Sequence, residues 1–137
     1  GWDIFSGLIA NLHAETSIKE IEAFEDYELI HINKMTSTVL NTYNASVFPK
    51  VMKWDENFRD PYKNTIDRFI ESQSNIDVIT TAPFLVGHKE ELMSTLWGFK
   101  NTQYTDMINA STLLLKEKVA VFKGLNTEIG EKGTERP

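Results

Sequence analysis

The chain of 137 residues contains no cysteine. Thiol catalysis, disulfide bonds and cysteine-ligated metals are therefore excluded. This absence does not fix the compartment, because it fits an extracytoplasmic domain and many cytosolic proteins equally well. The chain opens at Gly1 without a methionine, as a processed chain does. We therefore expect an extracytoplasmic or secreted location in preference to the cytoplasm.

Positive charge is scarce. Lys and Arg number 14 against 20 for Asp and Glu, which gives a formal net charge of −6. Residues 15–28 are the most acidic stretch, with Lys19 as their only base. Contacts to phosphate need clustered Lys and Arg, so we do not expect nucleic acid or an anionic membrane surface as partners. No apolar run is as long as a transmembrane helix, so no transmembrane segment is expected in this chain.

Glycine-based catalytic and phosphate-binding motifs are also missing. The seven glycines are scattered, and they form neither a phosphate-cradling loop nor a Gly-x-Ser-x-Gly turn. We therefore do not expect an enzyme. The composition, 41% hydrophobic and 25% charged, is that of a soluble globular domain, and the length suits one domain. We expect that domain over residues 1–125 and a flexible tail over 126–137.

Apolar residues recur at helical spacing in residues 17–39. One helix face, at roughly 100° per residue, collects five of them: Ile18, Ile21, Ile32, Met35 and Val39. Ser17 and Glu20 match a capping box at the start of this stretch. The pattern continues to about residue 45 and predicts one long helix that ends before Pro49.

Further helices are predicted after Pro61 and Pro83, each at a first helical position, and over residues 104–123 with Gly124 just past the end. Residues 2–14 predict a short N-terminal helical segment. Residues 78–81 are β-prone, but the run is short and its flanks read as helical. We therefore expect an all-α fold, an up-down bundle of about four main helices with a short N-terminal helical segment.

Two glutamates interrupt the apolar stripe of residues 17–39. On a helix, Glu28 and His31 would share one face, at the Glu-x-x-His spacing that carboxylate-bridged di-iron bundles use. Glu25 adds a carboxylate one turn earlier, and His88 lies on another predicted apolar stripe. No second Glu-x-x-His occurs. We expect no cofactor, with a divalent metal or iron on Glu25, Glu28, His31 and His88 as the alternative.

Aromatic side chains are the candidates for ligand contact. Trp97 lies off the apolar stripe of its predicted helix, Trp54 lies in a connection, and Tyr104 begins the last predicted helix. Exposed aromatics are typical of partner and ligand contacts, although they also cover the ends of bundles.

These observations predict a non-enzymatic helical-bundle binding or sensor module that recognises a protein partner or a small ligand. One alternative is a metal-binding carboxylate and histidine bundle. The other is a structural or assembly subunit, a homo-oligomer, in which the apolar segment that begins at Trp2 docks on a neighbouring chain.

Overall fold

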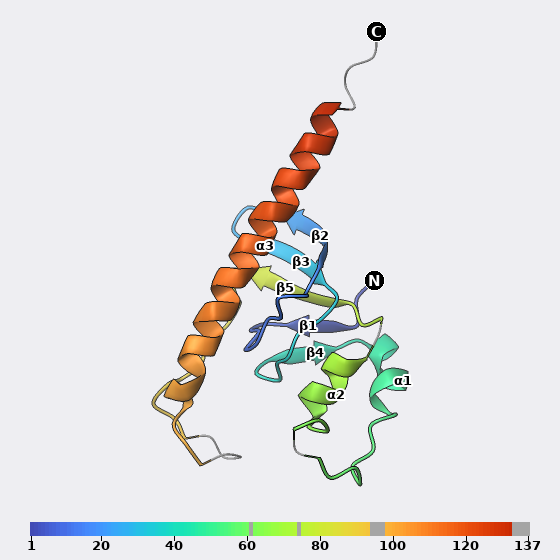
Figure 1. The fold of residues 1–137 in the computed structure, drawn as a ribbon, viewed down its shortest axis with the longest axis vertical. Coiled ribbons are helices and arrows are strands. Elements are labelled where there is room, and N and C mark those ends of the chain that lie inside the picture. The colour runs from blue at the N-terminus through green and yellow to red at the C-terminus, as the bar shows by residue number, and fades with distance from the viewer. Residues whose placement is uncertain (61, 74, 94–97, 133–137) are drawn as a thin grey trace.

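The computed structural model describes the backbone of residues 1–60, 62–73, 75–93 and 98–132 and, within these ranges, the side chains up to residue 124. The structure is mixed α/β, with a five-stranded sheet (Figure 1). The expected all-α helical bundle is therefore wrong.

The sheet contains five short strands in the order β2-β3-β5-β1-β4. They are β1 (Ile4–Ser6), β2 (Ile18–Ala23), β3 (Glu28–Ile32), β4 (Asn41–Tyr43) and β5 (Val78–Ala82). β1 and β5 are parallel, and the other three neighbouring pairs are antiparallel. β2 and β4 are the edges, and the neighbouring central strands β1 and β5 come from the two ends of the first 82 residues.

The helical elements of the described chain lie outside the sheet. They are the 3-10 turn η1 (Ala45–Val47), α1 (Phe48–Val51), α2 (Ile66–Ser72), the 3-10 turn η2 (Asn101–Tyr104) and α3 (Thr105–Lys132). α3 crosses the sheet diagonally, and α1 and α2 lie near the β4 edge (Figure 1). Within these described ranges, no helix is long and apolar enough to cross a membrane.

A single apolar core lies between the sheet and the helices. Alternate strand residues point into it, and Ile4, Ile30, Ile32 and Val78 are at most 1% exposed. The same cluster includes Ile70 of α2 and both Leu115 and Val119 of α3. Helices α2 and α3 therefore cover the same face of the sheet, and the fold has two layers.

The long helix expected over residues 17–45 is instead a β-hairpin followed by a loop. Ile30 and Ile32 are two positions apart and both fully buried, which is the period of a strand. Phe24 and Tyr27 stack across the turn, with ring centroids 4.8 Å apart. The helical stripe mixed residues of two antiparallel strands, because Ile18 of β2 faces Ile32 of β3.

Two other helix predictions also require correction. The segment after Pro61 forms only the short α2, and the β-prone run of residues 78–81, which we interpreted as part of a helical region, lies in the central strand β5. After Pro83 the described residues up to Met93 contain no helix. In β5, burial within the sheet overrides the local helix signals.

The helix prediction is correct near the C-terminal end of the chain and wrong at the N-terminal end. The helix expected over residues 104–123 is present as α3, which continues through Gly124 to Lys132. The flexibility of residues 126–137 stays a prediction. At the other end, residues 4–6 form β1, and the expected N-terminal helix is absent. Leu8, Ile9 and Leu12 are at most 5% exposed, buried within the chain itself.

Candidate functional site

A cleft of about 620 Å³ lies between α2, the first turn of α3 and the loop that follows β3. Its volume falls in the range of small-molecule sites, which is about 300–1,000 Å³. The lining comes from five segments: Ala10 and Asn11, residues 36–39, Tyr62 with residues 65–68 at the start of α2, His88, and Asn101, Tyr104, Met107 and Ile108 around the start of α3. Residues distant in the sequence therefore meet here.

The cleft combines apolar surface with unpaired polar groups. Val39, Ile66, Met107 and Ile108 supply the apolar surface. Five lining side chains form no hydrogen bond with any residue of the described ranges, and these are Asn11, Thr38, Tyr62, Thr65 and Tyr104. Their hydroxyl and amide groups are free to bond a ligand or water. The two formal charges of the lining, on Asp67 and Arg68, cancel.

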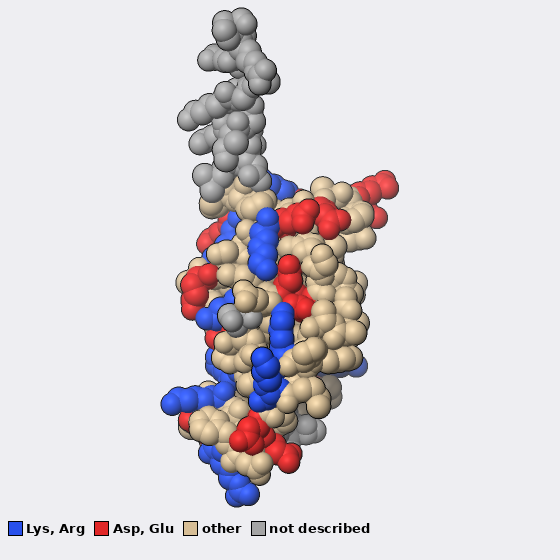
Figure 2. Space-filling model, turned by 90° about the vertical axis from the view of Figure 1, so that its right-hand side faces the viewer, with Lys and Arg blue, Asp and Glu red and all other residues tan. Residues whose placement is uncertain are grey.

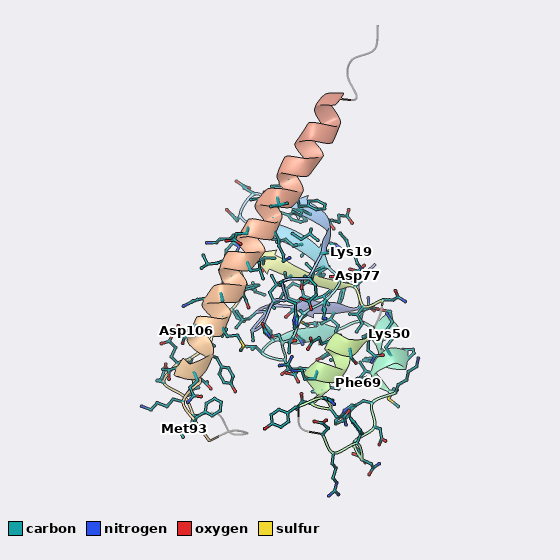
Figure 3. All side chains as sticks on the ribbon, in the orientation of Figure 1. Lys19, Lys50, Phe69, Asp77, Met93 and Asp106 are labelled. Carbon is teal, nitrogen blue, oxygen red and sulfur yellow. The ribbon has the colours of Figure 1, made fainter. Side chains whose placement is uncertain are left out.

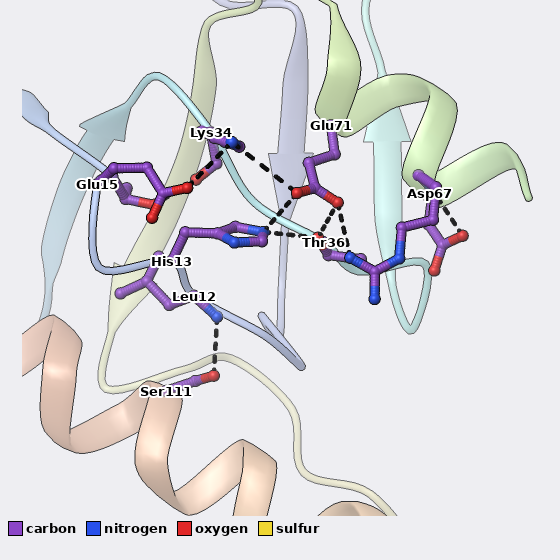
Figure 4. Close-up of polar contacts among 10 residues, drawn as sticks. Leu12, His13, Glu15, Lys34, Thr36, Asp67, Glu71 and Ser111 are labelled. Atoms are coloured by element: carbon purple, nitrogen blue, oxygen red, sulfur yellow. Dashed lines mark hydrogen bonds and ion pairs between the residues drawn. The ribbon is translucent and has the colours of Figure 1, made fainter. Parts of the chain in front are cut away.

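One wall of the cleft is held by a polar network around Glu71 of α2 (Figure 4). His13 Nε2 lies 3.1 Å from Glu71 Oε1 and 2.8 Å from Thr36 Oγ1. The Thr36 hydroxyl donates to Glu71 Oε2 at 2.8 Å, so Nε2 of His13 is the donor in both of its contacts. Arg68 Nη1 donates to the same Oε2 at 3.0 Å. The network fastens α2 to the loops after β1 and β3.

Glu71 is held as a carboxylate. Its burial acts to raise its pKa, but the hydrogen bonds from Thr36 and Arg68 and the nearby charges of His13 and Arg68 outweigh burial and lower the pKa below its ordinary value. Lys34 lies 3.9 Å from Glu71 Oε1 and 3.3 Å from Glu15, and so extends the network to the surface. Both carboxylate oxygens of Glu71 thus have fixed partners.

The opposite wall is fixed by Ser111 of α3. Its hydroxyl donates to the Ala10 carbonyl and accepts the Leu12 amide, each at 2.9 Å (Figure 4 shows the second bond). Ser111 is only 2% exposed. Near the start of α3, Thr105 Oγ1 donates to Glu90 and lies 3.5 Å from His88 Nε2. These contacts hold the segment after β1 and the segment of His88 against α3.

A second polar cluster lies at the far end of the sheet. Asp3 accepts hydrogen bonds from Lys50 at 2.9 Å, from Ser46 at 2.6 Å and from the Asp77 amide at 3.0 Å. Burial acts to raise the Asp3 pKa, but these bonds outweigh it and lower the pKa. Lys19 lies 3.4 Å from Asp77, and Figure 3 shows Lys19, Asp77 and Lys50 together on that side. This cluster joins α1 to the starts of β1 and β5, and its residues are not among those that line the cleft of about 620 Å³.

The three aromatic residues that the sequence suggested as ligand contacts do not lie together at the cleft. Tyr104 lines the cleft. Trp54 does not line it, and its indole Nε1 donates to the Asn64 carbonyl at 3.0 Å. Trp97 lies outside the described residues. Sequence reasoning missed Asn11, Thr38 and Arg68, although the three consecutive hydroxyl residues at positions 36–38 were a readable signal for Thr38.

The four candidate metal ligands do not converge. The i, i+3 spacing of Glu28 and His31 places them on opposite faces of strand β3, because strand side chains alternate. Glu28 pairs with Lys123 of α3, whereas His31 lies 3.3 Å from Glu22 and 3.5 Å from Asp77. Glu25 is exposed in the hairpin turn, and His88 lines the cleft. In the described part of the chain, no group of three or more His, Asp or Glu side chains is arranged to hold a metal.

Comparison of the chain with protein-family models, curated proteins and solved structures found no match.

Proposed function

We propose that the protein is a non-enzymatic binding module, and that its ligand is a small organic molecule with hydroxyl or amide groups and little net charge. The observation that carries the proposal is the set of unpaired polar side chains in the cleft. Tyr104, Thr38 and Asn11 approach from three segments and lie beside the apolar surface of Ile66 and Met107. A few convergent polar groups on an apolar lining are typical of small-molecule sites.

The charge of the lining supports the ligand class. Asp67 and Arg68 are adjacent and of opposite sign, so the cleft offers no net charge to attract an anion or a cation. Arg68 is also engaged by Glu71 at 3.0 Å. Recognition then depends on hydrogen bonds and apolar contact.

The saturation of Glu71 supports binding over catalysis. A general base needs an acceptor that can reach a substrate proton. In the Glu71 network, His13 and Thr36 use one carboxylate oxygen each. Arg68 and Lys34 add a second partner to Oε2 and Oε1, respectively. The network then serves to hold the cleft open in one shape rather than to transfer protons.

The test is ligand-observed NMR with the full chain and four probes: myo-inositol and nicotinamide as neutral polar molecules, and citrate and spermidine as charged ones. We expect saturation transfer to a neutral probe. We also expect affinity to fall by about tenfold in the double variant Thr38→Val and Tyr104→Phe, which removes two hydroxyls. Tyr27→Phe is the matched control, because Tyr27 does not line the cleft. Preference for citrate or spermidine, or binding by none of the probes, would overturn the ligand class.

A further inference from the structure

The central strands are apolar on both faces. Ile4 and Phe5 in β1, Leu29 and Ile30 in β3, and Val78 and Ile79 in β5 are consecutive residues that point to opposite sides. Strands of this kind are typical of sheets that are covered on both faces. Yet in the described structure the core joins α2 and α3 to one face alone, which carries Ile4, Ile30 and Val78.

The second face has an apolar hollow of about 490 Å³. Strand residues Phe5, Leu29 and Thr81 form its floor, and Phe84 and Leu85 of the segment after β5 form one side. Strand pairing places Leu29 opposite Thr81 on β5, and Phe5 opposite Ile79. The Thr81 hydroxyl oxygen is buried and has no hydrogen-bond partner among the described residues. The hollow is therefore part of the sheet surface itself, next to the apolar side chain of Ile79.

Large apolar side chains surround the hollow and face solvent. Leu85 is 62% exposed and Tyr27 is 44% exposed, and both line the hollow. Phe24, 48% exposed, stacks on Tyr27 in the β2–β3 turn. Contiguous exposed apolar side chains of this kind mark interaction sites.

The border of this face is acidic. Glu20 pairs with His31 and Glu22 with Leu29, so both glutamates of edge strand β2 lie on the second face. The adjoining turn adds two exposed acids, Glu25 and Asp26. Lys19 is beside them, but it is paired with Asp77 at 3.4 Å. In Figure 2 acidic side chains gather toward the upper part of the molecule, on the side where the described part of α3 ends.

We propose that this second face docks an amphipathic helix of a partner protein, with an apolar stripe bordered by lysine or arginine. Such a helix would give the sheet a third layer over the half-buried Phe5 and Leu29, beside Ile79 of β5, which the chain itself already buries. Its basic border would lie against Glu20 and Glu22. Charge complementarity disfavours a second copy of this chain, which carries the same acidic border, and disfavours an anionic membrane.

The experiment measures fluorescence anisotropy of two synthetic helical peptides with the full chain. Both peptides carry the same leucine stripe, bordered by lysine in one and by glutamate in the other. We expect the lysine peptide to bind, more weakly as salt rises. Its affinity falls by about tenfold in Leu85→Ser with Tyr27→Ser, and by about tenfold in Glu20→Lys with Glu22→Lys.

Matched controls lie on the outer surface of α3. Leu113→Ser changes a leucine that is as exposed as Leu85, 61% against 62%, and Glu117→Lys changes an exposed acid. Neither lines the hollow, so neither should weaken binding. Equal loss in these controls, equal binding of the glutamate peptide, or no binding of the lysine peptide would overturn the proposal.

Two further measurements keep the result independent of variant folding. Amide chemical-shift mapping on the unaltered chain should place the lysine peptide at Phe5, Leu29 and Leu85, and shifts confined to α3 would contradict the proposal. Sedimentation of the free chain should show a monomer. A dimer that Leu85→Ser dissociates would assign the face to a second copy instead. The cleft lies at other residues, so either proposal can fail alone.

Discussion

The two faces of the sheet differ in what covers them. On the face toward α3, Ile30 and Ile32 are fully buried in the core. On the other face, the neighbouring Leu29 is half-buried beside an open hollow. Adjacent residues of one strand thus have different surroundings. The first face holds the fold together, and the second leaves apolar surface exposed, which we propose that a partner covers.

The largest expected effect separates these two faces directly. Ile30→Ala should lower the free energy of unfolding by about 2–5 kcal/mol, because it leaves a cavity in the core. Leu29→Ala, one residue away, should cost less than half as much, because its side chain already contacts solvent. Urea unfolding followed by circular dichroism measures both. Equal losses would mean that the second face is as tightly packed as the first.

An intermediate effect is expected from acid. The pKa of Glu71 and that of Asp3 are lowered in the folded chain below the ordinary values of 4.5 and 3.8. The unfolded chain therefore binds protons more readily, and stability is present above these values. It is lost as the pH falls below them, through the lower folded pKa values. Thermal unfolding measured from neutral to acidic pH should show this loss.

Glu71→Gln sharpens the acid experiment. The variant should lose roughly 1–3 kcal/mol at neutral pH, because His13 and Thr36 lose a charged acceptor, and its acid dependence should be flatter. Glu56→Gln is the control, since Glu56 is exposed and has no hydrogen bond or ion pair in the described part of the chain. An unchanged acid slope in Glu71→Gln would assign the effect to other carboxylates.

Sequence periodicity predicted α3 and failed in the sheet for a physical reason. α3 is 28 residues long, so its spacing has many positions in which to repeat. β3 has five residues, and only Ile30 and Ile32 mark its period. Of these two residues, Ile32 happens to lie at helical spacing from Ile18 and Ile21 of the partner strand β2, and this produced a false helical stripe. The parallel pairing of Ile4 with Val78 joins residues 74 apart, and local pattern carries no information about it.

The candidate site was predictable only in part. Tyr104 was singled out as an aromatic and His88 as a metal ligand, and both line the cleft. Arg68 and Asn11 gave no signal, because their importance depends on the meeting of five distant segments. The pair of Glu28 and His31 shows the converse. The prediction that these two residues share a metal depended on a helix, and in a strand the same spacing puts the two side chains on opposite faces.

The smallest stability effect is expected on the open face, where it is most informative. Leu85→Ser should change the free energy of unfolding by no more than about 0.5 kcal/mol, because Leu85 is 62% exposed and contributes little to the core. We also expect the same variant to elute earlier than the unaltered chain from a hydrophobic-interaction column. Leu113→Ser, at 61% exposure, supplies the comparison for a leucine outside the hollow. If Leu85→Ser has the larger effect on retention, Leu85 belongs to a contiguous apolar surface, since a column contacts a patch more strongly than an isolated side chain. A large loss of stability instead would show that Leu85 packs on the sheet in solution, and the second face would then be partly covered by its own chain.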